Sequence, residues 1–218
     1  MDQLSNMAVR DIETVIHPYT NLATHREQGP FIIEEGKGIY VYDEKGKPYI
    51  EGLAGLWCTS LGYGNEELVE TAAEQMRRLS YTHIFSHKSN DVAIELAETL
   101  KEIVPCETSK ILFGSSGSDA NDMQIKLTWY YNNARGKPQK KKIISRIKGY
   151  HGVTVASGSL TGLPPVHADF DLPIHNIMHT SCPHYYRFGL DGETEDEFST
   201  RMAADLEDMI IREGPDTV

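Results

Sequence analysis

The sequence predicts an α/β protein whose mostly parallel sheet is flanked by helices, with a β-hairpin segment near the N-terminus. Two short apolar runs, 110–114 and 142–147, have the length and composition of strands, and a helical pattern lies between them. Short strands that alternate with helices are typical of a parallel sheet covered on both faces. Hydrophobic residues make up 39% of the 218 residues, which is enough for a sizeable core.

The acidic balance of the chain argues against two classes of partner. The formal net charge is −11 at pH 7, so nucleic acid and anionic membrane surfaces are unfavourable partners. No apolar run approaches the ~18 residues that a membrane span needs.

The three cysteines, Cys58, Cys106 and Cys182, are few and widely spaced, which indicates reduced thiols in a cytoplasmic protein.

The N-terminal part of the chain contains one hairpin signal. Residues 1–21 begin polar and give few core signals. Residues 38–42 and 48–51 then flank a polar connection that contains Gly46. This pattern predicts two antiparallel strands joined by a turn.

Capping residues and apolar spacing predict three further helices. Asn65 and Asn90 stand directly before the helical patterns 66–79 and 91–103, where an asparagine can accept hydrogen bonds from the first turn. A last amphipathic helix covers about residues 195–212.

Two segments towards the C-terminus give no helix or strand signal. Four prolines mark 162–192 as an irregular stretch. Residues 214–218 have the character of a loop that leads into another strand. We therefore expect the chain to be a fragment of a longer protein.

A polar turn at 114–118 separates the first predicted strand from the helix after it. Glycines let the backbone approach a ligand closely, and three serines add hydroxyl groups. The free N–H groups and the positive end of the helix dipole then favour an anion, typically a phosphate. No lysine closes a P-loop here, so a phosphate monoester fits better than a triphosphate. Taken alone, the turn could equally be an ordinary capped helix start.

A second polar segment, 146–152, follows the next predicted strand. Loops at the carboxyl ends of neighbouring parallel strands meet at one crevice, so this segment should lie beside the turn. Tyr150 could then place its ring against an aromatic ligand. A structural tyrosine is the simpler interpretation of Tyr150 by itself, but its position one strand after the turn favours a planar, phosphorylated cofactor.

Several spaced motifs in the same order identify a family resemblance. From about Asn21 onwards the chain resembles the N-terminal half of a class III aminotransferase, of the ω-amino acid/amine:pyruvate branch. The motifs are YVYD (40–43), IEG (50–52), GLAGLWC (52–58), SGSDAND (116–122) and GYHG (149–152). The resemblance implies the aspartate-aminotransferase-like fold type I of pyridoxal-phosphate enzymes, here truncated. The resemblance also implies two domains. Residues 1–52 would be an N-terminal part of the small domain, and residues 53–218 would be the first, incomplete part of the large cofactor-binding domain.

The resemblance also implies a cofactor and its contacts. Pyridoxal 5'-phosphate would be bound through its phosphate at the helix start and through its ring at the second segment. The phosphate contacts would be Ser116, Gly117 and Ser118, and the residues at the ring would be Tyr150, His151 and Gly152.

The implied reaction is transfer of an amino group from an amine donor to a keto acid such as pyruvate, in a homodimer whose active sites lie at the subunit interface. Leu56 and Trp57 would line the substrate cavity, and Phe85 would contribute from its own loop. No catalytic residue is assigned in this chain, because the family's Schiff-base lysine would lie beyond Val218. Another fold type I enzyme, such as an aminomutase or decarboxylase, and a non-catalytic binding piece are the alternatives.

A histidine-rich segment is the main competing signal. His175, His179, Cys182 and His184 have a spacing that could suggest zinc. The prolines around them argue against the ordered knuckle or helix that such a site uses, so no metal ligand is assigned.

Overall fold

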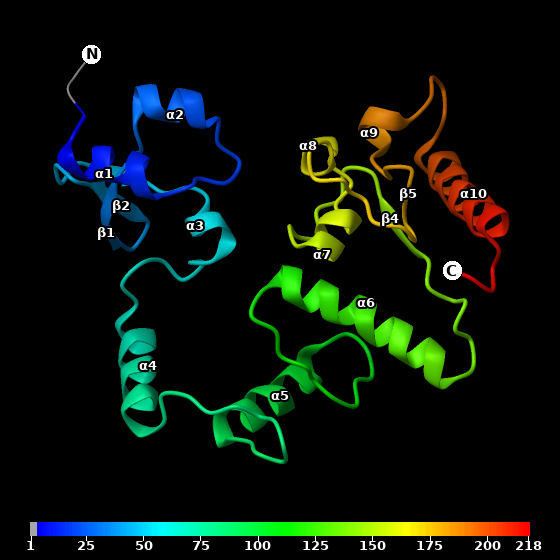
Figure 1. Ribbon diagram of the computed structural model, residues 1–218, viewed down its shortest axis with the longest axis horizontal. Coiled ribbons are helices and arrows are strands. Elements are labelled where there is room, and N and C mark those ends of the chain that lie inside the picture. Colours follow the sequence, from blue (N-terminus) through cyan, green and yellow to red (C-terminus); the bar gives the residue numbers. More distant parts are fainter. Residues whose placement is uncertain (1–3) are drawn as a thin grey trace. The chain divides into compact units, whose positions relative to one another are not determined.

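The computed structural model describes residues 4–218, which divide into two compact units. The first unit extends to Leu96 and the second runs from Ala97 to Val218 (Figure 1). The elements of the first unit are α1 (Asn6–Thr14), α2 (Leu22–Gln28), β1 (Ile33–Lys37), β2 (Tyr40–Asp43), β3 (Pro48–Ile50), α3 (Ala54–Trp57) and α4 (Glu66–Arg78). Helix α5 (Asp91–Ile103) crosses the division between the units.

The predicted hairpin is confirmed as β2 and β3, and β1 adds a third antiparallel strand beside β2. Its turn is held by Asp43, whose Oδ1 accepts hydrogen bonds from the amides of Lys45 and Lys47 at 2.9 Å each. The Tyr49 hydroxyl donates to Oδ2 of the same carboxylate at 2.9 Å. Local side-chain hydrogen bonds therefore fix the strand register at this turn.

The predicted N-caps of two helices are confirmed. Asn65 Oδ1 accepts from the amide of Leu68 at the start of α4. Asn90 Oδ1 accepts from the amide of Ala93 at the start of α5. The polar N-terminal stretch, where no element is predicted, forms α1. Ser5 caps that helix through its hydroxyl, which accepts from the Ala8 amide.

The second unit is built around a short parallel strand pair. Its elements are α6 (Gly117–Ala134), β4 (Ile143–Arg146), α7 (Val155–Leu160), α8 (Pro164–His167), β5 (Ile177–Thr180), α9 (Tyr185–Phe188) and α10 (Glu195–Glu213). The pairing of β4 with β5 runs from Ile143 opposite Ile177 to Arg146 opposite Thr180. Figure 1 shows the strand pair between α7 and α10. The parallel character expected of the sheet is confirmed for this pair.

The core of the second unit lies between α6, α7 and the strands. Ile125 from α6, Leu160 from α7 and Ile177 from β5 are buried against one another. Trp129 packs on this cluster, and its indole N–H donates to the backbone carbonyl of Lys141 at 3.0 Å. This packing fixes α6, which follows the polar turn 114–118, relative to β4, which leads into the polar segment 146–152.

Two sequence predictions about the second unit are wrong. The run 110–114 is not a strand, because its backbone pairs with no other strand among residues 4–218. The stretch 162–192 is not wholly irregular, since it contains β5 and the single turns α8 and α9. A four-residue strand such as β5 is too short to show alternation, and only its pairing with β4 defines it.

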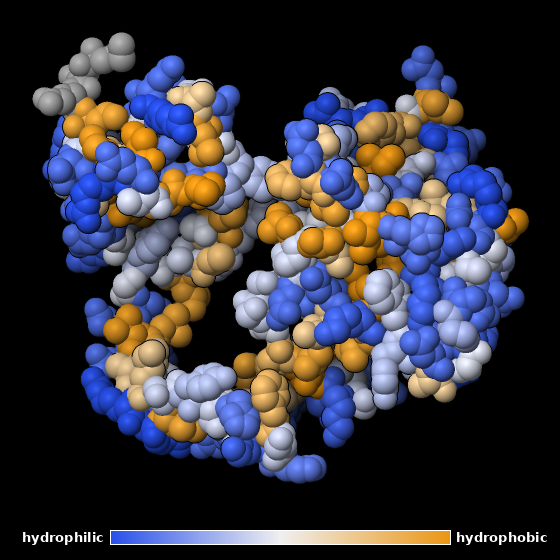
Figure 2. All heavy atoms as spheres, viewed as in Figure 1, coloured by the Kyte–Doolittle hydropathy of each residue, from blue (hydrophilic) through white to orange (hydrophobic). Residues whose placement is uncertain are grey.

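Apolar side chains remain at the surface of the second unit around α7 and α8 (Figure 2). Val153 and Val155, which open this region, are 58% and 65% exposed. Exposed apolar patches are characteristic of interaction surfaces. No helix within residues 4–218 combines the length and the apolar character that a membrane crossing requires.

Candidate functional site

The start of α6 offers two backbone donors without a partner. Ser116 is the N-cap, and its hydroxyl oxygen accepts from the Asp119 amide at 3.1 Å. The amides of Gly117 and Ser118 meet no hydrogen-bond acceptor among residues 4–218. A Cβ placed on Gly117 would have no neighbouring atom within 4 Å. The open, positively polarised end of an 18-residue helix can therefore hold an anion here.

Asp119 folds the turn back onto the helix. Its Oδ2 accepts from the amide of Ser115 at 2.9 Å and from the Ser115 hydroxyl at 3.4 Å. A Cβ on Gly114 would lie 2.9 Å from the same oxygen. A side chain at position 114 would therefore displace the Asp119 carboxylate, which holds Ser115 and leaves the amides of Gly117 and Ser118 without an acceptor among residues 4–218.

The second polar segment is fastened directly onto α6. Asn121 Nδ2 donates to the backbone carbonyl of His151 at 2.6 Å. The amide of Val153 donates to Ser118 Oγ at 3.2 Å, so the Ser118 hydroxyl still has its own hydrogen to donate. The structure therefore brings 150–153 beside the helix start, as the sequence predicts.

Asp122 completes this attachment. Its Oδ1 accepts from the Thr154 hydroxyl at 2.7 Å and from the Ser157 amide at 2.9 Å, which are the cap and third residue of α7. Sequence reasoning gives Asp122 and Asn121 no role, although both belong to the SGSDAND motif. The available signal was their place on the first turns of the helix that carries the anion site.

Gly152 is required where the two segments touch. Its φ is +129°, a value that residues with a Cβ rarely adopt, and the residue is buried. A Cβ there would collide with the hydroxyl oxygens of Ser118 and Ser157. The backbone on either side is held by Thr161, whose hydroxyl accepts from the His151 amide and donates to the Gly152 carbonyl. Gly152 thus permits the close approach of loop and helix.

Tyr150 and His151 differ in how far the protein encloses them. The Tyr150 side chain is 57% exposed, and its ring has no aromatic or cationic partner among the described residues. His151 is half-buried and lines an open pocket of about 570 Å³ together with Arg146, Lys148 and Gly149. A ring face therefore stays free beside the anion site, and a planar ligand can use it.

The residues predicted to contact substrate belong to the first unit. Leu56 and Trp57 are 61% and 76% exposed, and Phe85 is 73% exposed. Leu56 and Trp57 lie in α3, a turn whose residues have positive φ values. The amide of Phe85 donates to His83 Nδ1 at 3.2 Å. Their role towards a substrate stays a prediction.

The two lysines nearest the site in the sequence are placed differently. Lys126 is exposed on α6, where its nearest polar contact is the Met123 sulfur at 3.9 Å. Lys148 lines the pocket beside His151. Neither contact gives these lysines a catalytic role, and the expectation that this chain holds no catalytic residue stays a prediction.

Within residues 4–218, the side chains of the histidine-rich segment do not lie close enough together to bind one metal ion. His179 Nε2 is hydrogen-bonded to the backbone carbonyl of Leu160 at 3.1 Å, and partial burial lowers the pKa of this imidazole.

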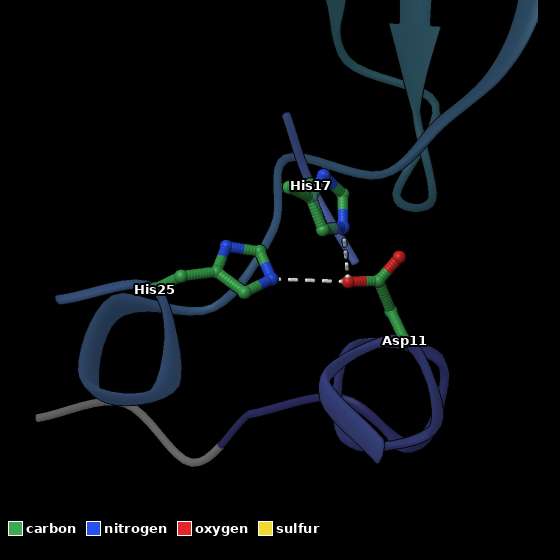
Figure 3. Close-up of side chains that lie close together, drawn as sticks. All are labelled: Asp11, His17 and His25. Carbon is green, nitrogen blue, oxygen red and sulfur yellow. Dashed lines mark hydrogen bonds and ion pairs between the residues drawn. The ribbon is translucent and has the colours of Figure 1, made fainter. Parts of the chain in front are cut away.

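A group that the sequence does not predict lies instead in the first unit (Figure 3). Asp11 Oδ2 meets Nε2 of His17 at 2.8 Å and Nε2 of His25 at 3.1 Å. Partial burial opposes ionisation of Asp11, but the two histidine contacts outweigh it and lower the pKa of the carboxyl. These hydrogen bonds account for the convergence of the three side chains, and they tie α1 to α2.

Comparison with known proteins places this geometry in a family. The model of the aminotransferase class-III family matches residues 22–218. The gamma-aminobutyrate transaminase 1, mitochondrial, of Oryza sativa subsp. japonica is 49% identical over 205 residues, which are 94% of this chain and 40% of the relative. The vanillin aminotransferase of Capsicum annuum is 52% identical over 190 residues, covering 87% of this chain and 41% of the relative.

A solved structure shows the same fold. The crystal structure of the omega transaminase from Pseudomonas jessenii in complex with PMP superposes with a TM-score of 0.96 at 54% identity, covering 98% of this chain and 47% of that one. The chain therefore spans less than half the length of these relatives. The fold type I architecture is confirmed for the part that the chain covers. The chain belongs to the class-III aminotransferase family.

Proposed function

We propose that this chain carries the cofactor-binding part of a pyridoxal-phosphate-dependent transaminase, which moves an amino group from an ω-amino acid or primary amine to a keto acid such as pyruvate. One observation supports this most directly. The free amides of Gly117 and Ser118 lie at the start of α6, directly beside the loop that carries Tyr150. Where two such features meet, one ligand can place its phosphate at the helix start and its planar ring against Tyr150.

The residues present fit pyridoxal 5'-phosphate. Its phosphate monoester matches two backbone N–H donors, the Ser118 hydroxyl and the helix dipole, with open space over Gly117. The exposed ring of Tyr150 matches its pyridine face, and His151 and Gly152 shape the pocket beside it. When bound, the cofactor supplies an electron sink for the charge that develops at the donor carbon. The residues of this chain anchor and orient the cofactor rather than move protons.

The remaining parts of the proposal concern the catalytic lysine, the subunit interface, the substrate cavity and the domains. The family's lysine would come from sequence beyond Val218, consistent with relatives more than twice as long. A homodimer would place the active site at the subunit interface and cover apolar surface such as Val153 and Val155. Leu56, Trp57 and Phe85 would line the substrate cavity. We keep residues 1–52 as part of the small domain and 53–218 as part of the large one.

The experiment that tests the function uses the protein extended to the length of its relatives. The protein is mixed with the cofactor, a primary amine and pyruvate, and alanine and the carbonyl product of the amine are measured. Equal amounts of the two products are expected, because amino transfer conserves nitrogen. Release of carbon dioxide, or rearranged amine without alanine, would identify a decarboxylase or an aminomutase instead.

The cytoplasmic location is also part of the proposal. All three cysteines are free thiols in the structure, as expected in a reducing compartment. The gamma-aminobutyrate transaminase 1 of Oryza sativa is described as mitochondrial, and the gamma aminobutyrate transaminase 3 of Solanum lycopersicum is described as chloroplastic. Cell fractionation with an antibody to the chain distinguishes the cytosol from an organelle.

A further inference from the structure

The loop after β3 contains four consecutive residues in the left-handed region of backbone space. Their φ values are 50° at Ala54, 59° at Gly55, 60° at Leu56 and 66° at Trp57. Only glycine adopts this region freely, because in other residues the Cβ crowds a backbone carbonyl oxygen. Three of the four residues carry a Cβ, so contacts with the surrounding chain must hold the turn in this conformation.

The carboxylate of Glu51 makes such contacts. Its Oε1 accepts from the amide of Leu53 at 3.1 Å, and its Oε2 accepts from the amide of Gly55 at 2.5 Å. Both oxygens are therefore used on the backbone at the start of the turn. Hydrogen bonds to an ionised acceptor are stronger than neutral ones, and two from one carboxylate also fix direction.

Glu51 itself stands on a fixed base. Its amide donates to the carbonyl of Ile39 at 2.9 Å. At the far end of the loop, Tyr63 exchanges two backbone hydrogen bonds with Gly38, at 2.8 and 2.9 Å. Both ends of the loop are thus joined to the same corner between β1 and β2. The Glu51 carboxylate can therefore hold the turn in a fixed position relative to this corner.

The turn directs two large apolar side chains outward. Leu56 and Trp57 are both exposed. The indole of Trp57 has no hydrogen bond or ring contact within residues 4–218. The backbone conformation of the turn therefore sets the direction in which the Trp57 side chain leaves the chain.

We propose that Glu51 is a positioning residue, whose carboxylate holds the left-handed turn that aims Leu56 and Trp57 and thereby determines which amine substituents are accepted. This inference rests on the proposed function, because it deepens the substrate role given to Trp57. Glu51 acts through the turn and needs no contact with substrate or cofactor. A flexible turn would let the indole move aside, which weakens discrimination by shape.

Fluorine NMR of protein labelled with fluorotryptophan tests the positioning directly. The Trp57 resonance is assigned by its absence in Trp57→Phe. In Glu51→Ala both acceptors are lost, and the resonance should move towards its position in the unfolded protein. Glu51→Gln keeps one acceptor oxygen and should give a smaller shift, which also provides an answer if Glu51→Ala fails to fold. The exposed Glu44 supplies the control, since Glu44→Gln makes the same charge change in the hairpin turn.

An unchanged Trp57 resonance in both Glu51 variants would overturn the positioning role. Enzyme kinetics then test the specificity. The ratio of KM values for a bulky and a small amine should change by about tenfold in Glu51→Ala, with kcat and cofactor affinity within about twofold of the parent. Equal losses for both amines would contradict the specificity role. If the parent transfers no amino group at all, the proposed function fails, whereas the NMR result still decides whether Glu51 positions Trp57.

Discussion

Asn121, on the second turn of α6, donates a 2.6 Å hydrogen bond from its amide nitrogen to the backbone carbonyl of His151. This contact joins positions 30 residues apart in the sequence. It belongs to a set of hydrogen bonds, with Ser118 and Asp122 as acceptors, that holds the Tyr150 loop beside the anion site. The geometry of the proposed cofactor site therefore depends on residues that would not touch the cofactor.

Replacing Asn121 by alanine tests that dependence. Loss of the hydrogen bond should lower the free energy of unfolding by about 1 kcal/mol. It should also weaken cofactor binding, because Tyr150 precedes the carbonyl that is released. Urea unfolding and an absorbance titration with pyridoxal 5'-phosphate measure the two effects. Gln124→Ala, at an exposed position of the same helix, is the control. Equal cofactor affinity in Asn121→Ala and the parent would show that the position of the Tyr150 loop does not affect cofactor binding.

A side chain at position 117 should be compatible with folding of the protein but not with binding of the cofactor. A Cβ there meets no protein atom within 4 Å, so Gly117→Ala should leave the free energy of unfolding unchanged or raise it by about 0.4–1 kcal/mol. Gly117→Leu fills the space assigned to the phosphate and should reduce cofactor affinity by at least about tenfold. Normal affinity in Gly117→Leu would refute the phosphate position, and thermal unfolding of the same samples serves as the folding control.

Ser118 should contribute to binding in a different way. Its hydroxyl accepts from Val153 and can donate to a phosphate. Ser118→Ala removes both, so cofactor affinity and the order of the loop should decline together. Combining Ser118→Ala with Gly117→Leu should weaken cofactor retention further than either change alone. Dialysis followed by measurement of retained cofactor gives the comparison, and full retention by the double variant would contradict the site.

Gly152 should respond in the opposite manner to Gly117. Gly152→Ala places a Cβ against the Ser118 and Ser157 hydroxyls at a φ of +129°. The expected cost is about 1–3 kcal/mol in the free energy of unfolding, from backbone strain alone. Chemical denaturation measures this. A Gly152→Ala protein as stable as the parent would show that the loop can withdraw from α6 without loss.

Acid stability should depend on Glu193. Hydrogen bonding to Arg201 lowers the pKa of this carboxyl to about 2, from an ordinary value of 4.5. A carboxyl whose pKa is lower in the folded protein than in the unfolded protein stabilises the folded protein at pH values above the unfolded-state pKa. The contribution is lost as the pH falls from about 4.5 towards about 2. The parent should thus be more stable than Glu193→Gln at neutral pH, and the difference should shrink across that window. A difference in unfolding midpoint that stays constant from pH 7 to the bottom of the window would contradict this assignment.

Local features were predictable because their causes are local. Asn65 and Asn90 cap the helices after them, and the β2–β3 hairpin closes around Asp43, all through hydrogen bonds that span a few residues. The anion-binding role proposed for Gly117 follows in the same way from a glycine at a helix start. The family resemblance likewise depended on short motifs that keep their order along the chain.

Long-range features were not predictable in this way. Strand β5 exists because Ile143 pairs with Ile177, and residues 110–114 form no strand because they lack a pairing partner in the described chain. The Asp11 group with its two histidines likewise assembles from separate segments. A four-residue strand such as β5 is too short to show a periodic signal, and a side-chain cluster forms only when the chain folds.

The sequence by itself determined the family, the helix that begins at Gly117 and the residue types of the proposed phosphate site, since each is encoded within a few consecutive residues. Only the tertiary structure decided how that site is held together. It assigned Asn121 and Asp122 to the Tyr150 loop and Glu51 to the turn of Trp57. The physical reason is that a hydrogen bond between distant segments depends on where packing places two backbones, and packing is a property of the folded chain.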